Sequence, residues 1–285
     1  MVDLQAAPPT ALTVAVGQAA CAALDVQANV ANAADLVRRA ADQGADLLVL
    51  PELFLTGYEL TAIAGDPAKY TTGPADPRLG PLSVACGQTG TAAVLGAPTR
   101  DPGTGRPFIS AIVLDRTGRY ATEYNKQHLD PAERAAGFGC GASGCTATMD
   151  GWRLGLGICW DSSFPEHARA AALDGCHAYL VGAMFDRGRG DLKRRILGPA
   201  RALDNACFVA FANHSGRSGP YVGCGASAVW GPDGALLADA GDGEPGVATA
   251  RLEPAVLAAA RAGDLPLADP SLTAPGTARR EAALW

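Results

Sequence analysis

The sequence is short of lysine, histidine and charge in general. Only Lys69, Lys126 and Lys193 are lysines among its 23 basic residues, and the chain has 4 histidines and 18% charged residues. A net charge of −6 offers no basic surface for a nucleic acid, which argues against a nucleic-acid-binding protein. The 48% of hydrophobic residues is too high for a disordered chain. Because no histidine stands at zinc-ligand spacing from cysteines or carboxylates, we expect no metal site.

Long apolar segments are absent as well. No stretch of about 18 uninterrupted apolar residues occurs, so we expect no membrane span. The opening MVDLQAAPPTALTV lacks the basic start and the apolar run of a secretory signal. We therefore expect a soluble protein of the cytoplasm, whose 8 cysteines remain free thiols in that reducing compartment. The cysteines stand at positions 21, 86, 140, 145, 159, 176, 207 and 224.

Alternation of strand and helix patterns indicates an α/β fold. Residues 12–17 and 46–52 are apolar runs of strand length, and residues 29–43 between them carry apolar residues at helical spacing. Asp25 and Asn29 are the expected N-caps of this helix. Because no linker or charge run divides the chain, we expect one domain over 1–285, with a core at about 12–261 and a tail at 262–285 that wraps a surface or a partner. Further strands are predicted at 92–97, 109–115, 120–124, 153–159, 178–183, 207–212 and 247–252, two around a turn at 226–239, and helices at 164–174, 191–205 and 254–261.

Polar side chains follow three of the apolar strands. Glu52 ends DLLVLPE, Lys126 follows Asn125, and Cys159 ends RLGLGIC. Taken singly, each has an ordinary interpretation. Glu52 could be an acid at a helix N-terminus, Lys126 a solvated lysine and Cys159 a buried thiol. Together they supply a base, a fixed positive charge and a nucleophile without histidine, because strand ends are where α/β folds place their sites.

The segments around these residues resemble the nitrilase superfamily, the carbon–nitrogen hydrolases. GADLLVLPELFLTGY (44–58) is similar to the glutamate motif, YNKQHL (124–129) to the lysine motif, and GLGICWDSSFPEHARAAALDG (155–175) to the nucleophile motif. The resemblance extends over about 12–261 and implies a four-layer α-β-β-α sandwich. Further similar stretches are 16–30, 200–213 and 227–241.

The resemblance also implies roles for individual residues. Glu52 would be the general base, Lys126 the oxyanion stabiliser and Cys159 the nucleophile of a mechanism that uses no cofactor. Glu133, in HLDPAERAAGF, is the candidate for the family's second glutamate, although the family spacing is often one residue longer. Family members commonly dimerise through helices on the nucleophile side, so a homodimer or a higher homo-oligomer is expected.

The substrate pocket is predicted less sharply. Tyr58, Trp160 and Phe185 are candidates for substrate positioning, with Met184 as a further pocket wall, and ordinary core packing is the alternative for the large apolar side chains. The bulky and charged stretch GAMFDRGRGD (182–191) departs from the small polar residues that relatives place there, so no named substrate transfers.

The sequence Cys-Trp-Asp at 159–161 is similar to the branch that hydrolyses small linear amides of the ω-amino amide or N-carbamoyl amine type. We therefore expect a hydrolase of non-peptide C–N bonds that forms a cysteine thioester and releases ammonia. The alternatives are a nitrilase, an acyl transferase that forms a new amide, and a non-catalytic binding or assembly homologue. An intact set of Glu52, Lys126 and Cys159 argues against the last of these.

Overall fold

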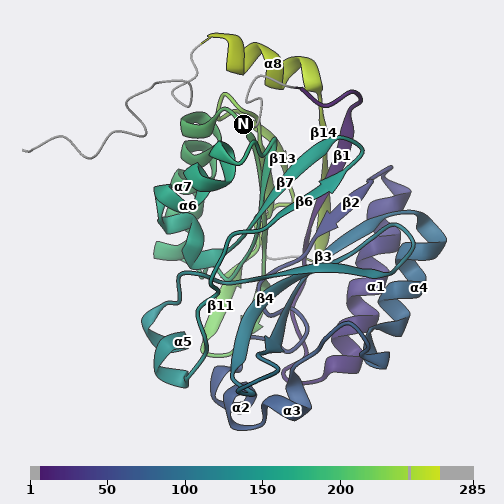
Figure 1. Ribbon diagram of the computed structural model, residues 1–285, viewed down its shortest axis with the longest axis vertical. Coiled ribbons are helices and arrows are strands. Elements are labelled where there is room, and N and C mark those ends of the chain that lie inside the picture. Colours follow the sequence, from purple (N-terminus) through teal and green to yellow (C-terminus); the bar gives the residue numbers. More distant parts are fainter. Residues whose placement is uncertain (1–6, 243–244, 264–285) are drawn as a thin grey trace, which may run out of the picture.

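The computed structural model describes residues 7–242 and 245–263, and it has four layers in the order α-β-β-α (Figure 1). Two six-stranded sheets pack face to face, and each contains parallel central strands with antiparallel strands toward the edges. In sheet order the first consists of β14 (Gly246–Leu252), β1 (Leu12–Gln18), β2 (Leu47–Val49), β3 (Ala92–Arg100), β4 (Pro107–Leu114) and β5 (Tyr120–Asn125), and the second of β13 (Leu236–Asp239), β12 (Ala228–Trp230), β9 (Phe208–Asn213), β8 (Ala178–Ala183), β7 (Trp152–Ile158) and β6 (Thr146–Met149).

The helices pack on the outer faces of the two sheets. α1 (Val26–Asp42) and α4 (Gly80–Thr89) cover the first sheet, and α6 (Pro165–Leu173) and α7 (Arg189–Asn205) cover the second (Figure 1). The α/β sandwich expected from the sequence is thus confirmed. Shorter elements gather at the ends of the strands: α2 (Leu60–Gly65), α3 (Pro67–Tyr70), α5 (Pro131–Ala136) and the hairpin of β10 (Ser215–Ser218) and β11 (Tyr221–Cys224).

In α1 the spacing of apolar residues in the sequence matches the buried face of the helix. Its apolar residues recur every three to four positions and are buried against the sheet, while Arg38 and Arg39 are exposed on the opposite face. Asp25 caps the helix as predicted, since its side chain accepts a hydrogen bond from the backbone N–H of Ala28. The second predicted cap was wrong. Asn29 lies inside the helix, fully buried, and its amide binds the backbone of Ala22 and Leu55.

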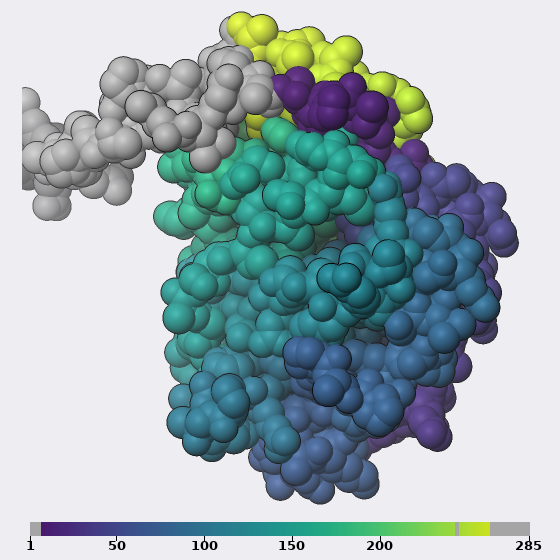
Figure 2. All heavy atoms as spheres, turned by 45° about the vertical axis from the view of Figure 1, so that its right-hand side comes forward, coloured from purple at the N-terminus to yellow at the C-terminus, as the bar shows by residue number. Residues whose placement is uncertain are grey.

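The two ends of the sandwich differ. The carboxyl ends of the parallel strands point toward α2, α3 and α5, whereas α8 (Pro254–Gly263) lies at the opposite end, beside the start of β1 (Figures 1 and 2). Buried Arg261 attaches α8 by donating to the carbonyls of Ala206 and Cys176, just ahead of β9 and β8. No helix in the described part of the chain is long and apolar enough to cross a membrane. The predicted wrapping of the tail falls beyond Gly263, outside the described residues.

Strand β2 is much shorter than its apolar run suggests. The run 46–52 predicts a strand along its whole length, but pairing ends at Val49 and the chain turns from Pro51 onward. The remaining apolar residues are still buried, because the turn passes between the two sheets and not over the surface. Burial without strand pairing gives the same sequence pattern as a buried strand.

Candidate active site

Glu52 lies in the turn after β2, where the backbone is held between the two sheets. A Cβ on Gly96 of β3 would come within 2.0 Å of the Pro51 carbonyl oxygen, and one on Gly182 of β8 within 2.6 Å of the Leu50 carbonyl oxygen. Only glycine therefore fits at these two places. Leu53 has a φ of +49°, a conformation that few non-glycine residues adopt, so the turn that aims Glu52 is strained.

His214 supports the Glu52 turn from the second sheet. Its Nε2 lies 2.5 Å from the Glu52 carbonyl oxygen, so Nε2 carries the proton and donates it. Burial lowers the pKa of His214 to about 4, which keeps the ring neutral. The backbone of the glutamate is thus fixed independently of its carboxylate.

Lys126 lies between two carboxylates. Its Nζ is 2.6 Å from Glu52 Oε1 and also donates to Glu133 Oε1, and all three side chains are fully buried. Glu133 is held by a capping box at the start of α5: Asp130 accepts from the Glu133 N–H, and the Glu133 carboxylate accepts from the Asp130 N–H. The Tyr58 hydroxyl, 2.5 Å from Glu133 Oε1, completes the contacts.

Cys159 begins the tight 3₁₀ turn η2 (Cys159–Ser163) after β7. Its φ of +39° is again unusual for a non-glycine residue, and the residue as a whole is half-buried at the strand exit. Sγ lies 3.9 Å from the Met184 carbonyl oxygen. The two glycines of the strand are needed for packing, since a Cβ on Gly155 would come within 2.9 Å of Ala171 and one on Gly157 within 2.2 Å of the Tyr179 hydroxyl.

These groups form one electrostatic cluster. Burial raises the pKa of Glu52 to about 8, the Lys126 ammonium opposes this shift, and the Glu133 carboxylate adds to it. The Cys159 thiol interacts with the Glu52 carboxylate, and burial together with Glu52 raises the thiol pKa well above its usual range. The cluster sets one cation against two carboxyl groups, so burial and the Glu133 charge together outweigh the Lys126 ammonium at Glu52.

We expect replacement of Glu52 by glutamine to stabilise the fold at alkaline pH. A carboxyl group whose folded-state pKa is raised contributes stability that is fully present below its unfolded pKa and is lost as the pH rises through the folded value. For Glu52 that window runs from the ordinary 4.5 to about 8. Glutamine does not titrate, so the melting temperature of Glu52→Gln should match the native value at pH 4.5 and exceed it at pH 9.

The control for this measurement is Glu166→Gln, which changes an exposed glutamate in the first turn of α6. Its melting temperature should follow the native protein at both pH values. A Glu52→Gln variant whose difference from the native protein is the same at pH 4.5 and pH 9 would contradict the buried, raised carboxyl group.

A cavity of about 370 Å³ opens beside Cys159. The predicted positioning residues Tyr58, Trp160 and Phe185 all line it, together with Met184. The alternative interpretation, that these side chains simply pack in the core, also holds for Tyr58, Met184 and Phe185, which are buried. Asp186, Arg189 and Gly190 of the predicted stretch 182–191 line the cavity as well. Four further lining residues were not singled out from the sequence: Asp130, Ser163, Lys193 and Tyr221.

The charged side chains Asp186, Arg189 and Lys193 at the mouth of the cavity come from α7 and the loop just before it. Arg189 and Lys193 stand one turn apart on α7, and the Lys193 ammonium lies 4.2 Å from the centre of the Trp160 ring. Asp186 accepts a hydrogen bond from the Gly190 N–H in the first turn of the same helix. Helical spacing of the two cations was readable from the sequence, but their approach to Trp160 depends on the packing of α7 against η2.

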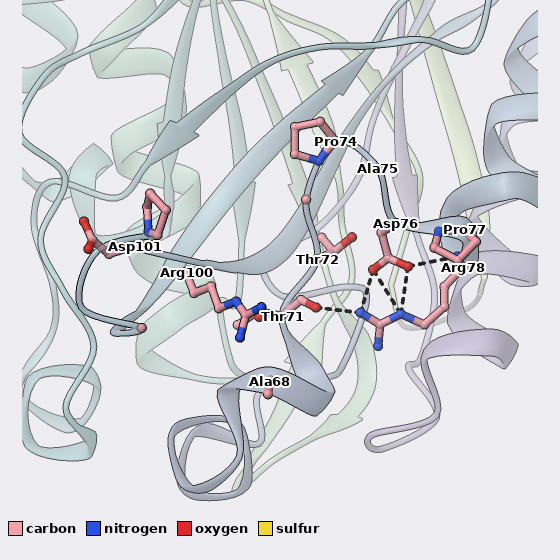
Figure 3. Close-up of a pocket in the computed structure, with 13 residues that line it drawn as sticks. Ala68, Thr71, Thr72, Pro74, Ala75, Asp76, Pro77, Arg78, Arg100 and Asp101 are labelled. Carbon is pink, nitrogen blue, oxygen red and sulfur yellow. Dashed lines mark hydrogen bonds and ion pairs between the residues drawn. The ribbon is translucent and has the colours of Figure 1, made fainter.

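Cavity size alone does not identify this site. A larger pocket of about 680 Å³ lies beside α3 and the segment 71–78, away from the predicted residues (Figure 3). Its polar groups are largely used within the protein: the Arg78 guanidinium binds the Asp76 carboxylate and the Thr71 carbonyl oxygen (Figure 3). The smaller cavity is the candidate because Cys159 lines it and interacts with Glu52, which in turn binds Lys126.

Tertiary structure also assembles a histidine–carboxylate cluster that sequence spacing does not indicate. Ligand atoms of His128, Asp161 and His167 lie within 4.8 Å of one another. The donor set does not favour a metal ion, because the Asp161 oxygens already accept hydrogen bonds from protein donors and the Tyr124 hydroxyl lies between Asp161 and His167. His128 is a hydrogen-bonded structural residue, as predicted, with Nδ1 3.0 Å from Asp161 Oδ1.

The cysteines behave as predicted. All eight are free thiols, and four of them, Cys86, Cys176, Cys207 and Cys224, are buried. Burial raises the pKa of Cys145 and Cys224, as expected of inert thiols. The pKa of Cys207 is raised by its side-chain hydrogen bond with Cys176 and then by burial. Cys159 differs from them in having both a carboxylate and an ammonium in its surroundings.

Comparison with known proteins agrees with this geometry. The family model of the carbon-nitrogen hydrolases matches residues 13–262. A hydrolase encoded in the pqqF 5′ region of Pseudomonas protegens is 36% identical over 220 residues, covering 76% of this chain and 75% of that protein. An omega-amidase of Saccharomyces cerevisiae is 28% identical over 262 residues, covering 86% of this chain and 88% of that protein.

Solved structures show the same similarity. An amidase from Nesterenkonia sp. superposes with a TM-score of 0.77 at 32% identity, covering 87% of this chain and 92% of that one. Further structures of that amidase, from strain AN1, include a complex with butyramide and one with covalent addition of the acetamide moiety of fluoroacetamide at the active-site cysteine.

Proposed function

The chain belongs to the carbon–nitrogen hydrolase family, and from this we propose that it hydrolyses the C–N bond of a small linear amide through a thioester on Cys159, releasing ammonia. One observation carries the proposal: the Cys159 thiol adjoins the Glu52 carboxylate, whose other contact is the Lys126 ammonium. Base, nucleophile and cation therefore share one buried site. The experiment is an assay of ammonia release from linear amides.

The first step is attack on the amide carbonyl. Glu52 takes the proton of Cys159 as sulfur bonds to the carbonyl carbon, and the negative charge moves to the carbonyl oxygen. Lys126 stabilises this oxyanion together with the backbone N–H of Trp160. An ammonium group has three N–H bonds, and Lys126 uses two on Glu52 and Glu133, so one remains for the oxyanion.

The later steps return the enzyme to its starting state. Protonated Glu52 gives its proton to the leaving nitrogen, the C–N bond breaks, and ammonia departs from a thioester. Glu52 then removes a proton from water, whose oxygen attacks the thioester carbon. Collapse of the second tetrahedral intermediate releases the acid and returns the proton to the sulfur. Glu133 orients Lys126 throughout, and Tyr58 orients Glu133.

The cavity limits the size of the substrate, and its charged lining residues favour a substrate whose end away from the amide is polar. A volume of about 370 Å³ suits a short chain. Asp130 and Asp186 at the mouth suit the ammonium group of an ω-amino amide, the type that the sequence resemblance favours. A second candidate is an amide with a carboxylate at its far end, because Arg189 and Lys193 line the same mouth and have no carboxylate partner among the described residues.

A matched substrate series separates these classes. Amides of equal chain length ending in a methyl, an ammonium or a carboxylate group are compared by kcat/KM, with an N-carbamoyl amine and a nitrile beside them. Ammonia plus acid from the amides supports hydrolysis. Ammonia from the nitrile supports a nitrilase, a new amide formed with an added amine supports an acyl transferase, and no turnover of any substrate supports a non-catalytic homologue.

Mutations at the mouth should shift KM according to substrate charge. Asp186→Asn is expected to raise KM for the ammonium-ended amide by about 2- to 5-fold, as for other exposed charge pairs, and to leave KM for the methyl-ended amide unchanged. Lys193→Met should raise KM for the carboxylate-ended amide by a similar factor. Equal effects on all three substrates would mean that neither charge contacts the substrate.

We further propose a dimer formed through the helices outside the second sheet. Leu192, Ile196 and Leu203 of α7 are 53%, 57% and 60% exposed and recur on one face of that helix, and Leu173 of α6 is exposed nearby in the same layer. Such large exposed apolar side chains on one layer indicate a contact surface. The expected occupant is a second copy of this chain, in line with the family resemblance.

Ile196→Asp should convert this dimer to a monomer, because a buried unpaired carboxylate in the interface is costly. Size-exclusion chromatography with light scattering measures the mass. Val84→Asp is the matched control, since Val84 is 53% exposed on α4, on the other side of the molecule. A native protein that is already monomeric, or an Ile196→Asp variant of unchanged mass, would contradict the proposed contact.

A further inference from the structure

A buried carboxylate two residues after the nucleophile connects the two halves of the site. We propose that Asp161 is a positioning residue that fixes Cys159 relative to Lys126, an inference that rests on the proposed function and adds a residue to it. Asp161 is fully buried and touches neither the cavity nor the three reacting groups in the hydrogen bonds of the structure. Its effect must therefore act through the backbone that carries them.

On one side, Asp161 holds the nucleophile turn. Its Oδ2 accepts a hydrogen bond of 3.0 Å from the Ile158 N–H, across the bend that contains Cys159. This contact closes a turn whose first residue has a positive φ. A strained bend persists only when its surroundings hold it, and this hydrogen bond is one such restraint.

On the other side, Asp161 holds the lysine segment. Oδ2 accepts a hydrogen bond of 2.7 Å from the Tyr124 hydroxyl, and Oδ1 accepts one of 2.9 Å from the His128 N–H. Tyr124 and His128 stand two residues before and two residues after Lys126. One carboxylate thus binds both flanks of the lysine and the bend of the cysteine, although the two segments are more than 30 positions apart.

Further groups orient the donors toward Asp161. The Tyr124 hydroxyl donates to the carboxylate, so its oxygen accepts from His167 Nε2 at 2.8 Å. His167 is then protonated on Nε2, and its Nδ1 accepts from the Tyr179 hydroxyl at 2.8 Å. Burial lowers the pKa of His167 and favours this neutral ring. Space for the Tyr179 hydroxyl exists only because residue 157 is glycine.

This arrangement requires a group that only accepts. Four protein groups face the two oxygens: the Ile158 N–H, the His128 N–H, the His128 ring and the Tyr124 hydroxyl. An asparagine has the same shape but presents an NH₂ group in place of one oxygen, and that group repels the donors on its side. Asp161→Asn therefore loosens one of the two connections without creating a cavity.

The test measures Asp161→Asn in the full-length protein. We expect kcat for the preferred amide to fall on the order of 100-fold, the cost of a displacement of about 1 Å between reacting groups, with KM changed less than threefold. The rate at which iodoacetamide alkylates Cys159 should fall as well. A purely structural residue would lower the melting temperature and leave both rates of the folded protein unchanged.

A matched control is Asp115→Asn. Asp115 also accepts several hydrogen bonds, from the N–H and hydroxyl of Thr117 and from the Arg119 N–H, but it stands in the turn between β4 and β5. Its kcat should be native. If Asp161→Asn does not fold, Tyr124→Phe removes a single donor to the carboxylate. It should lower kcat about 10-fold, the low end of what one hydrogen bond to a charged group is worth.

The outcomes are decisive. A folded Asp161→Asn with kcat within threefold of native, or with a raised KM and native kcat, overturns the proposal, and so does native kcat in Tyr124→Phe. If the native protein hydrolyses no amide, the proposed function fails, but alkylation of Cys159 still reports on the positioning. Native alkylation rates in Asp161→Asn would then overturn the role of Asp161 separately.

Discussion

Replacement of Cys159 by alanine is expected to abolish amide hydrolysis, lowering kcat by about 10⁴-fold or more, as loss of a nucleophile does in other covalent hydrolases. The proposed thioester cannot form without sulfur, and no other cysteine is placed to substitute. Alanine tolerates the φ of +39° no worse than cysteine. The thiol lies 3.9 Å from the Met184 carbonyl oxygen and also interacts with Glu52, whose contact with Lys126 remains in the variant. The variant should therefore fold with a nearly native melting temperature.

Two measurements check this result. Ammonia release gives kcat, and mass spectrometry of the protein mixed with substrate detects the acyl adduct, present on the native chain and absent from Cys159→Ala. Cys145→Ala is the control, because Cys145 is also half-buried but lies ahead of β6, outside the cavity. Substantial turnover by Cys159→Ala, or an adduct on another cysteine, would disprove the mechanism.

Replacement of Lys126 by methionine should remove both activity and stability. Within residues 7–242 and 245–263, the ammonium is the only cation that pairs with Glu52 or Glu133, and all three side chains are fully buried. Breaking a buried ion pair by removing one partner costs about 3–5 kcal/mol of unfolding free energy, since the remaining charge is uncompensated. Loss of the oxyanion stabiliser lowers kcat by a further 10²- to 10³-fold or so in the fraction that folds.

The stability loss of Lys126→Met should depend on pH. Without the cation, the raised pKa of Glu52 rises further, so the stability that this carboxyl group contributes is present at low pH and is lost as the pH rises. Urea unfolding at pH 5 and pH 8 measures this. The double variant with Glu133→Gln removes one of the two carboxylates and should recover much of the stability at pH 8 but none of the activity. Equal stability of Lys126→Met and the native protein at pH 8 would contradict the buried charge cluster.

Lys126→Met and Glu52→Gln make an informative pair. Glu52→Gln leaves one cation and one carboxylate, whereas Lys126→Met leaves two carboxylates and no cation. Both are expected to be inactive, yet one gains stability at alkaline pH and the other loses it. The proposed active site thus holds its base at the expense of stability, as preorganised sites commonly do.

Much of the fold was predictable from the sequence. Buried central strands are continuous apolar runs, and α1 shows apolar residues at helical spacing, so the α/β alternation could be read along the chain. The hairpin of β12 and β13 follows from its Pro-Asp-Gly turn. Two predictions, the length of β2 and the capping role of Asn29, were wrong for the same physical reason. Both depend on which backbone groups find hydrogen-bond partners, and sequence periodicity does not encode this.

Parts of the site were predictable too. Polar residues at the exits of apolar strands were visible at 52, 126 and 159, and the structure brings the first two into direct contact and the third beside them. Glu133 was a softer assignment because its spacing differs from the family pattern, and the capping box of α5 explains how it still reaches Lys126. Tyr58, Trp160 and Phe185 do border the cavity.

Local patterns along the chain determined the order of strands and helices and the three side chains at strand ends, because strand and helix periodicity and strand-end position are properties of neighbouring residues. Tertiary packing alone decided what surrounds those side chains. The Asp161 connection joins segments 33 or more positions apart, and the charged mouth combines α7 with the loop ahead of α5. Contacts of this kind leave no regular spacing in the sequence, because they depend on how the two sheets and their helices pack. These contacts bring the proposed base, cation and nucleophile together.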